Sequence, residues 1–286
     1  MKAESNEVKQ ILITGVAGFI GYHLARLLLS KNFHVIGIDN LNSYYDISLK
    51  KNRLKILHKS PNFQFYKSDL VKKNDIASIF AKYNFSHVVH LSAQVGINFS
   101  LKEPQLYIDS NITGFLNVLE NCKSYDVKNL IYASSSSVYG NNKELPFLED
   151  HKTDRPLSVY GVSKKVNELL AHSYSALYGL QTIGLRFFTV YGPWGRPDMA
   201  YYIFTKSIME NKMIDLFNNG HYRRSFTYID DVVRPIYRLI NTVDGLNLNS
   251  YEIFNIGGIE SIQIDRLVRI IENILNKKAK ITLQSK

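Results

Sequence analysis

Short apolar segments alternate with amphipathic helical patterns through the first two thirds of the chain, and this alternation restricts the fold more than any other feature. The apolar segments are short and rich in β-branched residues. Between them, apolar residues recur every three or four positions, as in Phe19–Ser30. Strands that are apolar on both faces are typical of a parallel sheet covered by helices on both sides. The sequence therefore predicts an α/β fold with a doubly wound, Rossmann-like parallel sheet.

The pattern places each expected element with definite bounds. The expected strands are Gln10–Thr14, His34–Asp39, Phe63–Ser68, His87–Leu91, Asn129–Ala133 and Thr182–Phe187. The expected helices are Phe19–Ser30, Ile47–His58, Asp75–Tyr83, Pro104–Ser124 and Val159–Tyr178.

The rhythm changes after Thr189, where glycine and proline crowd residues 192–197 and predict a loop. Further on we expect a strand at Ile214–Phe217 and an amphipathic helix at Ile262–Asn276 with Ser261 as its N-cap. Residues 1–188, rejoined by 226–257, are predicted to form the first domain. Residues 189–225 and 258–286 are predicted to form a smaller α/β lobe.

Composition narrows the function classes. The chain has 286 residues, of which 45% are hydrophobic and 21% charged, which is typical of a globular protein with a sizeable core. Cys122 is the single cysteine, so neither an internal disulfide nor a cysteine-based metal cluster is expected. The net charge of +10 comes from scattered side chains, so we expect small anionic ligands and no nucleic acid partner. No apolar run or leader pattern indicates a membrane span or secretion, and a cytoplasmic location is expected.

A glycine-rich turn gives the strongest local signal. Gly15, Gly18 and Gly21 directly follow the first predicted strand and open a helix. Glycines in this context allow a tight turn and close approach of the backbone to a pyrophosphate, which the free amides of the helix N-terminus then bind. The second predicted strand ends at Asp39, whose carboxylate can bond both hydroxyls of an adenosine ribose and would repel a 2′-phosphate. The expected cofactor is NAD.

A second pattern, Tyr160-x-x-x-Lys164, predicts catalytic residues. The spacing alone is weak, because Tyr139/Lys143 and Tyr202/Lys206 share it. Tyr160, however, opens a predicted helix, so Lys164 lies one turn further along the same face. Upstream, the predicted strand Asn129–Ala133 ends in four serines, 134–137, at the sheet edge where ligands bind in such folds. A hydroxyl, a phenol and an ammonium group can thus meet beside a nicotinamide.

These residue types suit oxidation of an alcohol. A nearby ammonium group favours the phenolate form of a tyrosine, which can then take a proton from a sugar hydroxyl as the carbon gives up a hydride. A serine hydroxyl bonded to the same oxygen stabilises the forming ketone. The alternative is that neither residue is catalytic, with Tyr160 packed in the core and Lys164 solvated.

Seven stretches of sequence resemble the extended short-chain dehydrogenases/reductases of the nucleotide-sugar epimerase group, and within it the UDP-glucuronate 4-epimerases. The similarity runs from about residue 10 to the end of the chain. The stretches are TGVAGFIG (14–21), DNLNSYYDISLK (39–50), YIDSNITGFLNVLE (107–120), SSSSVYG (134–140), YGVSK (160–164), VYGPWGRPDMA (190–200) and RRSFTYIDD (223–231).

The resemblance implies three sets of site residues. The catalytic set is Ser135, Tyr160 and Lys164. The cofactor-binding set is Gly15, Gly18, Phe19, Ile20, Gly21, Asp39, Asn40, Asp69, Leu70, Ser92, Ala93, Gln94, Asn111, Tyr160, Lys164 and Phe187. The substrate-binding set is Ser135, Ser136, Ser137, Thr189, Arg196 and Arg224, with the arginines suited to diphosphate and carboxylate.

The activity that the resemblance implies is NAD-dependent 4-epimerisation of a UDP-uronic acid, UDP-glucuronate to UDP-galacturonate, for surface polysaccharide synthesis. Group members that dehydrate or decarboxylate the sugar carry acidic residues where this chain has Ser136 and Ser137. Two alternatives stay open: epimerisation of a neutral UDP-hexose, and an impaired NAD- and UDP-sugar-binding protein, since relatives extend beyond the position of Lys286. A homodimer through Pro104–Ser124 and Val159–Tyr178 is also implied.

Overall fold

The computed structural model describes residues 9–242 and 250–285, which divide into two compact units. The first unit comprises Met1–Phe187 and Asp230–Ile256, and the second comprises Phe188–Ile229 and Gly257–Lys286. The first break falls one residue before the expected boundary. The returning segment was expected at 226–257 and is Asp230–Ile256, so residues 226–229 and Gly257 belong to the second unit and not to the first.

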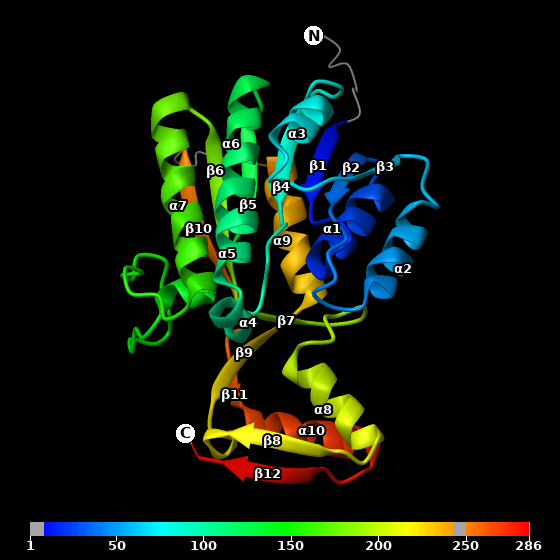
Figure 1. Cartoon of the computed structure of the whole chain (residues 1–286), viewed down its shortest axis with the longest axis vertical. Coiled ribbons are helices and arrows are strands. Elements are labelled where there is room, and N and C mark those ends of the chain that lie inside the picture. The colour runs from blue at the N-terminus through cyan, green and yellow to red at the C-terminus, as the bar shows by residue number, and fades with distance from the viewer. Residues whose placement is uncertain (1–8, 243–249, 286) are drawn as a thin grey trace. The chain divides into compact units, whose positions relative to one another are not determined.

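The first unit is built on a parallel seven-stranded sheet with the order β10-β6-β5-β4-β1-β2-β3 (Figure 1). This is the doubly wound, Rossmann-like α/β fold that the alternating pattern predicts. Its strands are β1 (Gln10–Thr14), β2 (His34–Asp39), β3 (Phe63–Lys67), β4 (Phe85–His90), β5 (Asn129–Ser135), β6 (Gln181–Phe187) and β10 (Tyr251–Ile256).

Helices cover both faces of this sheet, which explains why its central strands are mostly apolar on both sides. On one face α3, α6 and α7 lie side by side (Figure 1), and their apolar residues pack with Leu12, Val88 and Leu130 of the strands. On the other face α1 contacts α2, and the ring of Phe33 after α1 meets Tyr237 of α9. The helices of this unit are α1 (Phe19–Ser30), α2 (Ile47–Leu57), α3 (Lys73–Phe80), α4 (Ile97–Lys102), α5 (Pro104–Tyr107), α6 (Gly114–Ser124), α7 (Val159–Tyr178) and α9 (Ile229–Thr242).

Several expected elements of the first unit differ from the observed ones by one to three residues at an end, and two differences concern the site. The expected helix Pro104–Ser124 is divided, because a π-helical turn at Ile108–Thr113 separates α5 from α6. Such turns insert an extra residue into a helix and occur often at functional sites. Strand β5 continues two residues further than expected, to Ser135, and a 3₁₀ turn follows at Ser136–Tyr139.

The second unit holds a small apolar core between two helices and a pair of strands. Ile208 of α8 (Ala200–Met209), Leu216 of β8 (Met213–Phe217) and Val268 of α10 (Ile264–Leu275) are buried together. Strand β8 pairs in parallel with β12 (Lys280–Gln284), and a separate sheet has the order β11-β9-β7. The strands of that sheet are β7 (Thr189–Tyr191), β9 (Arg223–Tyr228) and β11 (Ser261–Gln263).

The expected N-cap of the last helix is wrong. Ser261 lies in β11, where it pairs with Ser225, and α10 begins at Ile264 after Gln263. Alternation of Ile262 and Ile264 fits a strand and a helix equally over so short a run, so the pattern could not place the boundary. Among residues 9–242 and 250–285, no helix combines the length and the apolar character that crossing a membrane requires.

Candidate active site

The turn between β1 and α1 brings backbone groups closer together than side chains would allow. Gly15 has a φ of +73°, and a Cβ there would lie 2.7 Å from the backbone nitrogen of Ser92. A Cβ on Gly21 would lie 2.3 Å from the carbonyl oxygen of Gly15. Gly18 precedes the first residue of α1 and no side chain caps that helix. Its first amides therefore remain available to an anionic ligand.

Asp39, at the end of β2, lies next to this turn. Its carboxylate accepts hydrogen bonds from the backbone N–H groups of Ala17 (3.2 Å) and Leu41 (2.8 Å). Burial raises the pKa of Asp39, while the charge of Lys50 and the two backbone bonds oppose that rise. Such a buried carboxylate, facing the glycine turn, fits the ribose-binding role that the sequence predicts.

The π-helical turn places Asn111 between two parts of the site. Its side-chain oxygen accepts a 2.7 Å hydrogen bond from the backbone N–H of Gln94, after β4, and its nitrogen donates to the carbonyl of Gln94 at 3.1 Å. The same nitrogen donates to the Ser163 hydroxyl on α7 at 2.9 Å. Ser163 in turn donates to the carbonyl of Tyr160. The expected cofactor loop and the first turn of the helix that carries Tyr160 are thus directly linked.

Helix α7 positions Tyr160 and Lys164. The hydroxyl of Ser158 accepts a 3.0 Å hydrogen bond from the N–H of Gly161, which caps the helix and places Tyr160 in its first turn. The ammonium group of Lys164 donates to the carbonyl oxygen of Ala133 on β5 at 2.9 Å. Burial lowers the pKa of Lys164 to about 8.

The serine end of β5 has an ordered local structure. Ser135 is the last residue of the strand, and its hydroxyl oxygen accepts a 3.2 Å hydrogen bond from the backbone N–H of Ser137. Its hydroxyl also donates to that of Ser137 at 3.2 Å. Ser136 and Ser137 belong to the 3₁₀ turn that follows. The hydroxyl of Ser135 is therefore held at the carboxyl edge of the sheet.

The residues of the predicted cofactor set all lie in the first unit, most of them at the carboxyl ends of its parallel strands. Gly15, Gly18, Phe19, Ile20 and Gly21 follow β1, Asp39 and Asn40 end or follow β2, Asp69 and Leu70 follow β3, Ser92, Ala93 and Gln94 follow β4, and Phe187 ends β6. The side-chain nitrogen of Asn40 donates to Asp69 at 2.9 Å, which joins two of these groups. The glycine cradle, the free helix amides and the buried carboxylate together fit a dinucleotide such as NAD.

Three predicted substrate residues lie in the second unit. Thr189 begins β7 and pairs with Phe226 of β9. The guanidinium group of Arg196 forms a two-pronged ion pair with the carboxylate of Asp198. Arg224 is exposed on β9, and its guanidinium group lies 5.7 Å from the centre of the Tyr222 ring.

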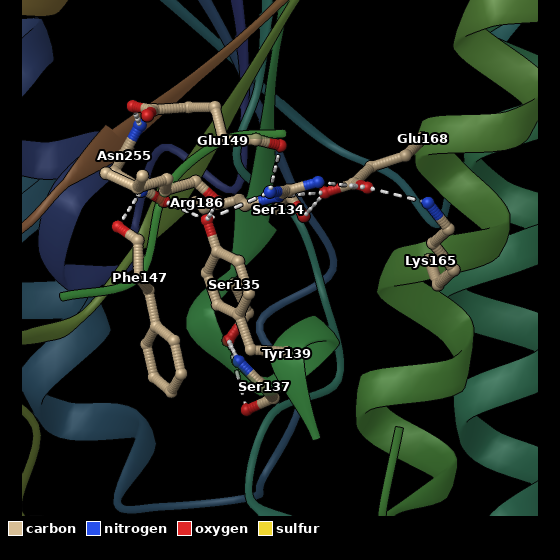
Figure 2. Close-up of polar contacts among 11 residues, drawn as sticks. Ser134, Ser135, Ser137, Tyr139, Phe147, Glu149, Lys165, Glu168, Arg186 and Asn255 are labelled. Carbon is tan, nitrogen blue, oxygen red and sulfur yellow. Dashed lines mark hydrogen bonds and ion pairs between the residues drawn. The ribbon is translucent and has the colours of Figure 1, made fainter. Parts of the chain in front are cut away.

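A buried polar network that the sequence pattern does not predict lies beside the serine turn (Figure 2). Its centre is the ion pair between Arg186 of β6 and Glu168 of α7, which also contacts Ser134 and Tyr139. Two signals in the sequence point to it. Arg186 is a charged residue within an apolar strand, and Glu168 lies one turn beyond Lys164 on the same helix face.

The parallel sheet, the glycine turn and the tyrosine–lysine helix define a nucleotide-binding protein of the short-chain dehydrogenase/reductase type. The chain belongs to the NAD dependent epimerase/dehydratase family, whose model matches residues 11–257.

Named relatives are similar over most of the chain. Protein CapI of Staphylococcus aureus is 47% identical over 284 residues, covering 95% of this chain and 85% of that protein. UDP-glucuronate 4-epimerase of Thermodesulfobacterium geofontis is 47% identical over 270 residues, covering 94% and 81%. The crystal structure of UDP-glucuronic acid 4-epimerase from Bacillus cereus, in complex with UDP-glucuronic acid and NAD, superposes with a TM-score of 0.89 at 36% identity, covering 97% of this chain and 86% of that one.

Proposed function

We propose that this protein is an NAD-dependent nucleotide-sugar epimerase that inverts C4 of UDP-glucuronate to give UDP-galacturonate. The observation that carries the proposal is the attachment of Lys164, one turn after Tyr160, to β5 just before Ser135. Similarity to proteins named UDP-glucuronate 4-epimerase, at 42–47% identity, supports the choice of substrate.

Each catalytic side chain has a separate task. Tyr160, as phenolate, takes the proton of the sugar 4-hydroxyl. Lys164 stabilises that negative charge through its buried ammonium group. Ser135 donates a hydrogen bond to the same sugar oxygen and stabilises the carbonyl that forms there. NAD, when bound at the glycine turn and Asp39, would supply the acceptor and later the donor of the hydride. The 4-keto sugar turns about its diphosphate link between the two hydride transfers, and Tyr160 returns the proton.

Ser136 and Ser137 support epimerisation over the other reactions of the family. Loss of water from a sugar needs an acid and a base near the reacting carbons, and loss of carbon dioxide from a 4-keto uronic acid is helped by an acid that protonates the product enolate. A serine hydroxyl neither donates nor takes a proton readily near neutral pH, but it can bond a carboxylate. We assign Ser135, Ser136 and Ser137, with Thr189, Arg196 and Arg224, to the substrate. Arg196 offers a planar fork that suits a carboxylate or phosphate, a geometry it already uses with Asp198.

The test is to incubate the purified protein with UDP-glucuronate and NAD and to separate the products by chromatography. We expect UDP-galacturonate without net NADH, and Tyr160→Phe should abolish its formation. Tyr202→Phe is the matched control, because Tyr202 has the same spacing to a lysine but is an exposed residue of α8.

Other products would overturn the proposal in distinguishable ways. A UDP-pentose would mean decarboxylation, and turnover of UDP-glucose but not UDP-glucuronate would mean a neutral-hexose epimerase. In the first case the serines fail to protect the carboxylate. In the second, Arg196→Leu would leave the rate unchanged. Stabilisation of the protein by UDP-glucuronate without any product would indicate binding alone.

We further propose that two copies associate through α6 and α7. These helices contact one another and expose apolar residues, among them Leu116, Val162, Leu169 and Leu177. The last three recur every seven or eight positions, so they form a stripe along α7. Leu169→Glu should convert a dimer to a monomer in light-scattering measurements. Ile274→Glu, at an exposed residue of α10, is the control.

A cytoplasmic location and a role in surface polysaccharide synthesis complete the proposal. UDP-galacturonate is an activated uronic acid, which a glycosyltransferase can add to a growing polymer. Deletion of the gene should remove galacturonate from surface polysaccharide, and cell fractionation should recover the protein with soluble cytoplasmic enzymes.

A further inference from the structure

Arg186 and Glu168 form a buried ion pair next to the catalytic serine strand (Figure 2). The guanidinium Nε donates to Glu168 Oε1 at 2.9 Å, and Nη2 donates to Oε2 at 3.0 Å. Only 4% of the Arg186 side chain and 1% of the Glu168 side chain are exposed. Burial raises the pKa of Glu168, but the hydrogen bonds from Arg186 and Ser134 outweigh it and the pKa is lowered. The pair is therefore ionised.

Glu168 attaches α7, the helix that carries Tyr160, to β5, the strand that ends at Ser135. Its Oε1 accepts a 2.6 Å hydrogen bond from the hydroxyl of Ser134, the residue before Ser135. One turn earlier on α7, Lys164 bonds the carbonyl of Ala133. Two successive residues of β5 are thus fixed to one face of the helix that carries Tyr160. The relative placement of Ser135 and Tyr160 depends on this alignment.

Arg186 also holds the connection between the two catalytic hydroxyls. Its Nη1 donates to the hydroxyl of Tyr139 at 2.9 Å and to the carbonyl of Glu149 at 3.0 Å. Asn255 of β10 donates to the carbonyl of Phe147 at 2.9 Å. Tyr139, Phe147 and Glu149 lie in the segment that runs from Ser135 to the start of α7. A long connection has many conformations unless it is held at points along its length.

Stability alone is a weak reason to keep such a pair. Removing two charges from water costs much of what their attraction returns, and apolar side chains of similar volume often serve a fold equally well. The ion pair lies between β5, β6 and α7, so it can fix the position of the helix relative to the two strands.

We propose that Arg186, acting through Glu168 and Tyr139, is a positioning residue that holds Ser135, Tyr160 and Lys164 in register for proton and hydride transfer. This inference rests on the proposed function, because it assigns Arg186 a role in the same reaction. Misplacement of a catalytic group by about 1 Å lowers a rate by roughly 100-fold.

The test compares Arg186→Met with the double variant Arg186→Met/Glu168→Met. The single variant leaves a buried carboxylate without its cation and should lose much of its stability. The double variant removes both charges and should recover part of the thermal midpoint. We expect its kcat to stay about 100-fold below wild type, while KM for UDP-glucuronate and the affinity for NAD change little. Arg186→Lys should recover part of kcat. In the double variant, the amide hydrogens of residues 135–149 and of the first turn of α7 should exchange faster than in the wild type.

Lys165→Met is the matched control. Lys165 contacts Glu168 Oε2 at 3.4 Å from the more exposed side, and its removal leaves the bonds to Arg186 and Ser134 in place. It should keep wild-type kcat. Recovery of kcat together with stability in the double variant would overturn the positioning role. If the wild type lacks turnover of UDP-glucuronate, the proposed function fails instead, and unchanged amide exchange at 135–149 in the double variant would then overturn the inference.

Discussion

The ammonium group of Lys164 donates a 2.9 Å hydrogen bond to the carbonyl oxygen of Ala133, two residues before Ser135 on the same strand. This bond fixes a buried positive charge at the edge of the sheet where the serine turn begins. It also ties the helix that carries Tyr160 to the strand that carries Ser135. Lys164 therefore has both an electrostatic and a geometric role in the proposed site.

Replacement of Lys164 by methionine should remove both roles. Since Tyr160 would lose the cation that favours its phenolate, we expect kcat to fall by about 100-fold to 10,000-fold, the usual contribution of acid–base catalysis. Steady-state kinetics with UDP-glucuronate measures this effect. Lys206→Met, at the equivalent spacing after Tyr202 on α8, is the control and should keep wild-type kcat. Equal rates for Lys164→Met and wild type would contradict the assigned role.

The rate should also fall on the alkaline side. Burial lowers the pKa of Lys164 to about 8, so the side chain carries its charge below that pH and loses it above. We expect kcat to decline as the pH rises through about 8, because the neutral amine no longer stabilises the Tyr160 phenolate. A profile of kcat from pH 6 to 10 tests this, and a rate that rises steadily across this range would refute it. Lys164→Arg should move any alkaline decline to higher pH, because arginine keeps its charge.

Gly15→Ala should weaken cofactor binding and stability together. The positive φ strains any other residue, and the added Cβ would lie 2.7 Å from the Ser92 nitrogen. We expect a loss of about 1–3 kcal/mol in the free energy of unfolding and reduced NAD affinity by calorimetry. Gly179→Ala is the matched control. Gly179 has a φ of +67° but nothing within 4 Å of its added Cβ, so NAD affinity should stay unchanged.

His90 should make the protein sensitive to acid. Burial, helped by the nearby charge of Lys164, lowers the pKa of His90 to about 3, whereas an unfolded histidine titrates near its ordinary value of 6.5. Between these values the unfolded state binds one proton more, so stability falls as the pH falls through the window. His90 should contribute a slope of about 1.4 kcal/mol per pH unit.

Urea unfolding at several pH values between 4 and 7 measures the slope. The imidazole Nδ1 is 2.9 Å from the Thr14 hydroxyl, so His90→Asn keeps a polar group near that contact while removing the titration. The variant should show a flatter dependence on pH than the wild type. His221→Gln, at an exposed residue, should leave the slope as it is. An equally steep slope in His90→Asn would exclude this histidine as its source.

Much of the fold could be predicted because it depends on local physics. The bounds of β1, β2, α1 and α7 match the expected ranges, since strand patterns, a glycine turn and a serine cap act over a few neighbouring residues. The prediction of Ser261 as an N-cap was wrong because the local pattern there was ambiguous. Over a few residues the local pattern fitted a strand and a helix equally, and pairing with Ser225 decided between them.

The features of the predicted site also fall into those that depend on neighbouring residues and those that depend on tertiary packing. The sequence by itself determined the parallel sheet, the glycine turn at Gly15 and the spacing of Tyr160 and Lys164, because each follows from short-range sterics or from the period of a helix. The tertiary structure decided the π-helical turn around Asn111 and the burial of Lys164. It also decided the pairing of Arg186 with Glu168. Arg186 comes from β6 and Glu168 from α7, and Ser134, which bonds Glu168, comes from β5. Long-range charge pairing has no sequence period, so only the packing of α7 onto β5 and β6 brings these groups together.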